Sequence, residues 1–378
     1  MKNKTQTHIG WIDYLRIFAC ILVVLAHSCD PFVAKTDSNY SEFLTGSFLG
    51  SLVRSCVPLF VMISGVLLLP VKTDMSTFYK KRFKRILMPF VFWSLALPLL
   101  YYFYLNFGPE TVNPNISMDE HSLNATLTKL YTFVFNFNYD TIPLWYVYML
   151  IGLYLFIPIL GGWLSQASKK DVQIVIGIWL AASVLQYVEL GAPFLGYTGN
   201  GGNLGMWGIC DWNVFGSLYY FSGFMGYLIL GHYLVKYPLN WSSSKRWKIG
   251  LPVILLGFTV TYIGFVFTQK YFPEHFSYLE IIWSFNNINV VMMTVPIFII
   301  AQNIKKVATS RVKLISSLTY GIFLAHFFFV QVVYDLLYPA LELPTALIII
   351  LITALSFLMT LLVVWILSLN KLTKKFVM

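Results

Sequence analysis

Charged residues are scarce in this 378-residue chain: they make up 11% of it, whereas hydrophobic residues make up 58%. The mean hydropathy is +0.70, far above the range of soluble globular domains. No stretch marks a separate soluble domain, and no internal repeat is visible. These absences exclude a water-soluble enzyme and a repeat array. They predict one integral-membrane domain over residues 1–378, with an all-α polytopic fold.

Cysteine is also rare, with four residues that show no metal-ligand spacing. No dinucleotide fingerprint with a βαβ context is present either, so we expect no metal and no bound cofactor. A disulfide between Cys29 and Cys210 on the outer side is left open by the sequence.

Long apolar runs are what the chain has in place of charge. A hydrocarbon core about 30 Å thick needs around 20 apolar residues per helix. Runs of that kind predict about ten transmembrane helices, at residues 10–30, 47–70, 86–105, 144–164, 172–190, 213–235, 249–269, 279–301, 315–338 and 344–369. The first run carries Asp13 and Arg16 and lacks a small-x-small cleavage site, so we expect it to be retained and not removed as a signal peptide.

The basic residues are distributed unevenly along the chain. Of the 26 Lys and Arg residues, 21 fall in the terminal segments and in alternate connections between the apolar runs. Because Lys and Arg accumulate in cytoplasmic loops, both termini are expected to be cytoplasmic. The external connections are then about 106–143 and about 191–212. The net charge of +10 is therefore interpreted as a topology signal and not as nucleic-acid binding.

The first apolar run contains two ionisable residues that a lipid-facing helix would avoid. Arg16 and His27 are eleven residues apart, so in a helix they face the same way about 16 Å apart. Asp13 and Cys20 share that stripe. An ionisable group near the bilayer centre costs about 3 kcal/mol, so the stripe is expected to line a site. For Asp13 and Arg16, anchoring at the cytoplasmic interface is the alternative; His27 lies too deep for that.

Two further candidates lie inside predicted helices. Arg54 is about seven residues, or roughly 10 Å, from the external end of the second run, at a depth similar to that of His27. The two predict a polar cavity in the outer half of the membrane, although Arg54 could instead extend to the interface. His326 lies near mid-membrane and is a secondary candidate, with a ring satisfied by a backbone carbonyl as the structural alternative.

The predicted cytoplasmic side carries a basic segment, FYKKRFKRILMP, before the third apolar run. Its Arg82 and Arg85 are spaced i, i+3, so they share one helical face and suit a phosphate ligand. Anchoring by the positive-inside rule would explain the same residues.

Together these elements resemble the membrane acyltransferase type 3 family. The resemblance rests on Arg16–x10–His27, VPLFVMISGVLL at 57–68 and RFKR at 82–85 in that order. PLWYVYMLIGLYLFIPIL at 143–160 and YGIFLAHFFF at 320–329 are similar to further family segments. The context of Arg54 resembles the surface-polysaccharide O-acyltransferase branch, which includes the O-acetyltransferase of enterobacterial common antigen.

The resemblance implies a multi-pass enzyme of the bacterial inner (plasma) membrane. It would move an acyl group, acetyl more readily than succinyl, from cytosolic acyl-CoA to a hydroxyl of a surface glycan or its lipid-linked precursor. Arg82 and Arg85, with Arg16, would hold the CoA phosphates. His27 would act as general base or acyl carrier, and Arg54 would stabilise the oxyanion.

A secondary transporter or flippase for a glycan or small molecule is the alternative. Such proteins also place polar groups at mid-membrane, commonly between inverted repeats. Neither repeats nor an intramembrane chain of carboxylates is present in the sequence. Nothing in it indicates the oligomeric state.

Overall fold

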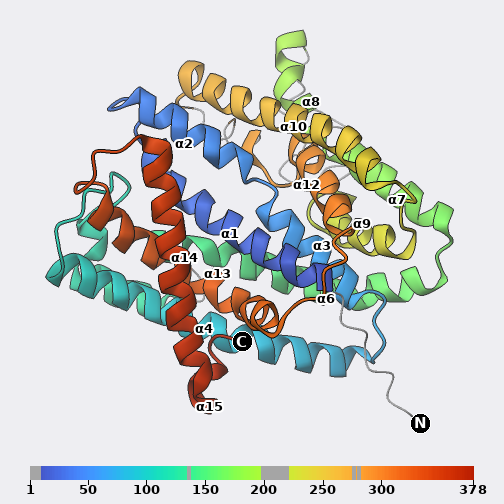
Figure 1. Ribbon diagram of the computed structural model, residues 1–378, viewed down its shortest axis with the longest axis horizontal. Coiled ribbons are helices and arrows are strands. Elements are labelled where there is room, and N and C mark those ends of the chain that lie inside the picture. The colour runs from blue at the N-terminus through green and yellow to red at the C-terminus, as the bar shows by residue number, and fades with distance from the viewer. Residues whose placement is uncertain (1–9, 134–137, 197–220, 275–277, 279–281) are drawn as a thin grey trace.

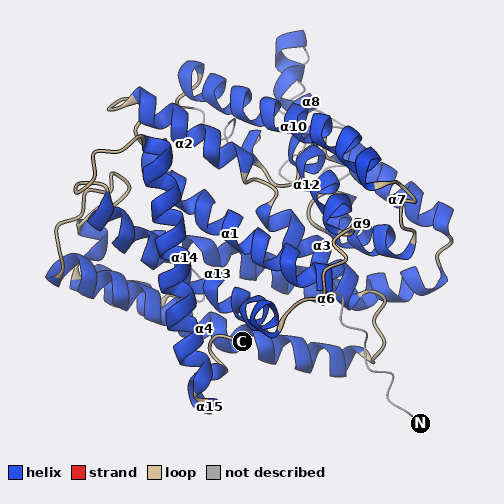
Figure 2. Ribbon diagram, in the orientation of Figure 1, coloured by secondary structure: helices blue, strands red, loops and turns tan. Residues whose placement is uncertain are grey.

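The computed structural model describes the whole chain except residues 1–9, 134–137, 197–220, 275–277 and 279–281. Within these described parts the protein is built of helices and loops, with no strand (Figure 2). The elements are α1 Gly10–Val33, α2 Tyr40–Leu52, α3 Cys56–Leu68, α4 Met75–Phe107, η1 Asp119–His121, α5 Leu123–Tyr131, η2 Tyr139–Leu144, α6 Trp145–Gln166, α7 Lys169–Ala182, α8 Leu185–Gly191, η3 Ala192–Leu195, α9 Met225–Lys236, α10 Ser243–Tyr271, α12 Ile288–Ala301, α13 Ser310–Leu337, α14 Thr345–Leu369 and α15 Lys371–Lys374.

Eight helical segments in the described part of the chain are long and apolar enough to cross a membrane. They coincide with eight of the ten predicted runs, so the all-α polytopic class is confirmed. The other two runs, 213–235 and 279–301, correspond to the shorter helices α9 and α12, of 12 and 14 residues. Parts of both runs lie outside the described residues.

The second predicted run corresponds to one apolar segment, Tyr40–Leu68, which consists of two helices. The chain becomes helical earlier, at Tyr40, and then breaks at Val53–Ser55 between α2 and α3. Pro58 explains the break, because it has no N–H to donate to the carbonyl of Arg54 four residues earlier and its ring crowds that carbonyl. Arg54 therefore lies in a bend between two helices and not inside a helix.

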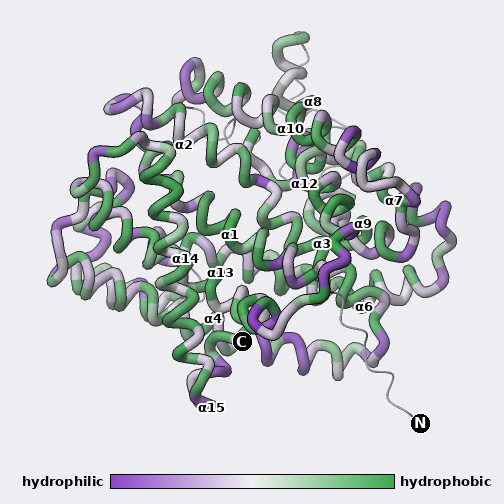
Figure 3. The backbone as a smooth tube through the Cα atoms, viewed as in Figure 1, coloured by the Kyte–Doolittle hydropathy of each residue, from purple (hydrophilic) through white to green (hydrophobic). Residues whose placement is uncertain are grey.

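Helix α1 occupies the middle of the bundle (Figure 1) and packs against α2, α3, α13 and α14. Helix α3 packs closely against α9 because glycines face the neighbouring backbones. A Cβ atom at Gly65 would overlap the Leu228 carbonyl, and one at Gly231 would overlap the Met62 carbonyl. The outer helices carry hydrophobic residues along most of their length, most clearly α14 (Figure 3), as a lipid-facing helix requires.

The predicted external segment after α4 is folded in its described part. The buried Asp140 carboxylate accepts hydrogen bonds from His121 Nε2 at 2.7 Å and from Lys129 Nζ at 2.8 Å. Farther along, Asp335 of α13 accepts from Thr111 Oγ1 at 3.0 Å. The segment is thus fastened to itself and to α13. Most of the second predicted external segment, 191–212, lies outside the described residues.

Candidate active site

A cavity of about 460 Å³ opens among α1, α3, α4, α6 and α13. Its volume lies within the range of small-molecule sites, about 300–1,000 Å³. The lining includes Leu67 and Leu68 at the end of α3 and the early turns of α4. It therefore lies at the end of the bundle that the Lys and Arg distribution predicts to be cytoplasmic.

Three arginines that sequence reasoning selected meet in this cavity: Arg16, Arg82 and Arg85 all line it. Arg16 Nη1 donates to Ser316 Oγ of α13 at 3.2 Å, and Ser316 Oγ donates to Asp13 Oδ1 at 2.7 Å. A serine on the facing helix thus joins Asp13 and Arg16 into one network.

The local structure of α4 brings its two arginines to the same wall. Asp74 caps the helix by accepting a hydrogen bond from the backbone N–H of Thr77 at 2.9 Å, and this bond lowers the pKa of the Asp74 carboxyl. Arg82 and Arg85 follow on one face, as their i, i+3 spacing predicts. Arg82 Nε is buried and has no hydrogen-bond partner among the described residues.

His27 lies farther along α1, outside this cavity, and is paired with a carboxylate. Its Nδ1 is 2.7 Å from Asp30 Oδ2, one helical turn away. A carboxylate accepts at Nδ1, so in the neutral form of the His27 ring the tautomer that fits this contact has its proton on Nδ1 and its lone pair on Nε2. A histidine oriented in this way is the arrangement that general-base catalysis uses.

A second histidine contacts the first. The ring centres of His27 and His326 are 5.2 Å apart, and Phe327 packs against His27 at 5.0 Å. His326 is fully buried; its Nδ1 donates to the Phe323 carbonyl at 2.7 Å, and its Nε2 has no partner among the described residues. Nδ1 of His326 therefore has the backbone partner that a structural histidine needs. A functional role would use Nε2.

Arg54 lies on the aromatic residues before α12. Its guanidinium carbon is 4.1 Å from the centre of the Trp283 ring and 5.4 Å from that of Phe285. Arg54 Nε donates to the Gly50 carbonyl at 3.1 Å, and the guanidinium interacts electrostatically with Asp30. A cation held against aromatic faces is stabilised by their quadrupoles. Arg54 thus belongs to the His27 region and not to the cavity.

The predicted stripe on α1 faces α13 along its whole length. Asp13 and Arg16 contact Ser316, Cys20 Sγ donates to the Thr319 carbonyl at 3.7 Å, and His27 contacts His326. The structure therefore divides the predicted residues into two groups, one at the cavity and one around the two histidines. Cys29 is a free, buried thiol, and Cys210 lies outside the described residues.

Sequence reasoning missed two residues that complete these groups. Asp30 had a visible signal, since it follows His27 by three positions and shares its helical face. Ser316 had none, because its role depends on how α13 packs against α1.

The fold is that of a multi-pass membrane protein, and the cavity within it is of a size that holds a small molecule. A family model described as an acyltransferase domain matches residues 9–369, so the chain belongs to the acyltransferase 3 family. Comparisons with curated proteins and with solved structures give no match.

Proposed function

We propose that the protein is a membrane O-acyltransferase that moves an acyl group, acetyl by preference, from cytosolic acyl-CoA to a hydroxyl of a surface glycan or its lipid-linked precursor. The observation that carries this proposal is the arginine-lined cavity on the same two helices, α1 and α13, that hold the histidine pair farther along. Membership of the acyltransferase 3 family supports it independently. The protein would act in the bacterial inner membrane, in the surface-polysaccharide branch of the family.

The donor would bind at the arginine end. CoA is a polyanion, and Arg82 and Arg85 present two guanidinium groups on one wall of the cavity. Guanidinium groups bind phosphates through two parallel hydrogen bonds, which also orients the ligand. Arg16, opposite on α1, would be the third contact. The pantetheine arm would then run along the cavity toward the histidine pair.

The acceptor hydroxyl would react at His27. Nε2 takes the hydroxyl proton as the oxygen forms a bond to the thioester carbonyl carbon. The tetrahedral intermediate then expels the CoA thiolate, the C–S bond breaks, and the proton passes from His27 to sulfur. The products are the O-acyl ester and free CoA. Asp30 holds Nδ1 and stabilises the imidazolium that forms.

The same Nε2 offers a second route, in which the acyl group rests on His27 before it reaches the acceptor. Labelled acetyl-CoA separates the routes when the acceptor is left out. Label retained on His27 would indicate a carrier, and direct transfer leaves the protein unlabelled.

The acceptor side would be the part of the bundle covered by the folded external segment. Phe327, which packs on His27, also contacts Tyr139, and the centres of these two rings are 5.1 Å apart. The Tyr139 hydroxyl accepts a hydrogen bond from Asn113 Nδ2 at 3.2 Å. Arg54 would meet the developing oxyanion from the opposite side, a role worth about 2.7–4 kcal/mol where donors are preorganised.

A transporter remains the second candidate because of the breaks before α3 and before α12. Discontinuous helices in secondary transporters place substrate sites at mid-membrane. Family membership and the arginine-lined cavity favour acyl transfer, since a transporter has no need of a CoA site.

Purified protein in proteoliposomes tests the proposal. Acetyl-CoA added to the arginine-rich face, with a lipid-linked glycan in the bilayer, should be consumed only when the glycan is present, and the glycan should gain an acetyl mass. Movement of the glycan without loss of the thioester would contradict the proposal and identify a transporter.

A further inference from the structure

The end of the cavity away from Arg82 and Arg85 is closed by aromatic side chains. On α3 the lining residues run from Leu68 to Phe60, on α6 from Tyr154 to Tyr146, and on α13 from Ser316 to Phe323. Tyr154 interacts electrostatically with Arg82 and Arg85 as well as with Arg16, whereas Tyr146 interacts with Arg16 alone among the arginines, so Tyr154 marks the end that holds Arg82 and Arg85. On each helix the deepest lining residue is aromatic.

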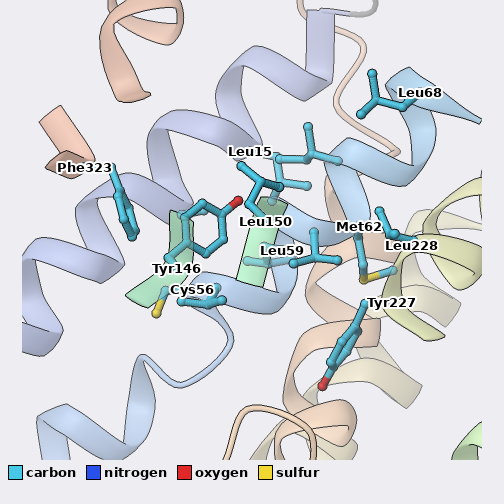
Figure 4. Close-up of a cluster of buried hydrophobic side chains, with 14 of the residues drawn as sticks. Leu15, Cys56, Leu59, Met62, Leu68, Tyr146, Leu150, Tyr227, Leu228 and Phe323 are labelled. Atoms are coloured by element: carbon cyan, nitrogen blue, oxygen red, sulfur yellow. The ribbon is translucent and has the colours of Figure 1, made fainter. Parts of the chain in front are cut away.

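These three rings contact one another and form what we call the aromatic floor: Phe60, Tyr146 and Phe323. Phe323 is 4.7 Å from Tyr146, ring centre to ring centre, and 6.2 Å from Phe60. Phe60 and Tyr146 are 6.3 Å apart. Figure 4 shows the rings of Tyr146 and Phe323 side by side. Two of the three floor residues are phenylalanines, and the Tyr146 hydroxyl is the polar group that the floor carries.

The histidine pair lies directly beyond this floor. The ring of His326 is 6.0 Å from that of Phe323, and its Nδ1 donates to the Phe323 carbonyl. His27 follows at 5.2 Å from His326. The thickness of a side chain therefore separates the end of the cavity from the proposed catalytic region.

We propose that the aromatic floor is the acyl-binding end of the cavity and restricts the donor to short acyl groups. With the CoA phosphates held at Arg82 and Arg85, a two-carbon acyl group brings the thioester carbonyl up to the floor, with Phe323 and His326 between it and His27. Each added methylene must fit between that carbonyl and the three rings, or hold the carbonyl back. A succinyl group extends beyond acetyl by two carbon atoms, so it meets the same limit of length.

This inference rests on the proposed function, and donor binding tests it without the acceptor. Protein in nanodiscs is titrated with acetyl-CoA, butyryl-CoA and succinyl-CoA in competition with labelled CoA. A methylene in a hydrophobic pocket discriminates by about 10-fold or more. We expect butyryl-CoA and succinyl-CoA to bind at least tenfold more weakly than acetyl-CoA.

Two substitutions enlarge the floor, Phe323→Leu and the less buried Phe60→Leu. Each should reduce the ratio of acetyl-CoA affinity to butyryl-CoA affinity at least threefold while leaving CoA affinity unchanged. Phe329→Leu is the matched control, because it makes the same change on α13 outside the cavity. If Phe323→Leu does not fold, Phe60→Leu carries the test.

The outcomes separate the two proposals. Equal binding of acetyl-CoA, butyryl-CoA and succinyl-CoA by the unchanged protein would overturn the floor and leave the acyltransferase proposal standing. A ratio of acetyl-CoA affinity to butyryl-CoA affinity that neither Phe323→Leu nor Phe60→Leu changes would also overturn the floor and leave the acyltransferase proposal standing. Failure of every CoA thioester, and of CoA itself, to bind would overturn both.

Discussion

At the scale of single residues, Asp30 fixes which nitrogen of His27 can accept a proton. Replacing the carboxylate with an amide in Asp30→Asn keeps the size but allows the wrong tautomer. Because loss of general-base catalysis typically costs about 10²–10⁴ in rate, kcat should fall by about 10² or more. The KM for acyl-CoA should stay unchanged, since Asp30 is outside the cavity. A fall in donor affinity with normal kcat would contradict this role.

Substitutions can distinguish a ligand-binding role of Arg82 and Arg85 from a role in membrane topology alone. The neighbouring lysines supply the control. The double variant Arg82→Ala, Arg85→Ala should raise the KM for acyl-CoA by roughly 10–100-fold, as expected from losing hydrogen bonds to charged groups of about 1.5–3 kcal/mol. Lys at both positions should restore only part of the affinity, because it lacks the planar fork.

The matched control for this pair is Lys81→Ala, Lys84→Ala. It removes the same charge from the same helix, but both lysines are exposed and neither lines the cavity. Equal effects of the two double variants on the KM would mean that the arginines only fix orientation.

Much of the site could be predicted at this scale, and the reason is local geometry. Arg16, Arg82 and Arg85 were selected by helical spacing and by the cost of burying charge, and the structure brings all three to one cavity. The separation of His27 from that cavity could not be predicted, because it depends on the aromatic side chains that α3, α6 and α13 place between them.

At the scale of elements, the contact of α3 with α9 depends on Gly65 and Gly231. An alanine Cβ at either position would overlap a backbone carbonyl that cannot move aside. Overpacking of this kind costs about 1–3 kcal/mol. Gly65→Ala should therefore lower the thermal unfolding midpoint in detergent by several degrees.

Gly152→Ala in α6 is the control, since a Cβ there meets nothing within 4 Å. It should leave the midpoint unchanged or raise it slightly, as alanine favours the helix. An unchanged midpoint in Gly65→Ala would show that α3 and α9 are free to separate.

The positions of most helices followed from hydropathy, whereas their interruptions did not. Hydropathy averaged over 20 residues predicts one apolar run at 47–70. Pro58 and the contact of Arg54 with Trp283 produce a bend within it. Tertiary contacts stabilise such bends, and a single sequence does not show which distant residue supplies them.

At the scale of the whole molecule, the distribution of Lys and Arg predicts the orientation in the membrane. Single cysteines next to Lys169 or Lys245 should react only with reagents that enter the cell, and cysteines next to Lys270 or Glu342 should react from outside. The free cysteines Cys20, Cys29 and Cys56 are buried and give little background, and Cys210→Ser removes the fourth. Labelling of a cysteine next to Lys169 by a reagent that does not cross the membrane would contradict this orientation.

The central claim is that His27 performs the chemistry, and its direct test is acyl transfer by His27→Asn and His27→Gln. Both amides keep hydrogen bonding and approximate size, so a structural histidine would tolerate them. His232→Asn is the control, since His232 is buried in α9 and does not line the cavity, and its Nδ1 is bonded to the Leu69 carbonyl at 3.1 Å. With all variants shown to be folded and inserted, we expect both His27 variants to lose about 10²–10⁴ in the rate of glycan acetylation. Near-normal acetylation in either one would contradict the account and leave His326 as the candidate base.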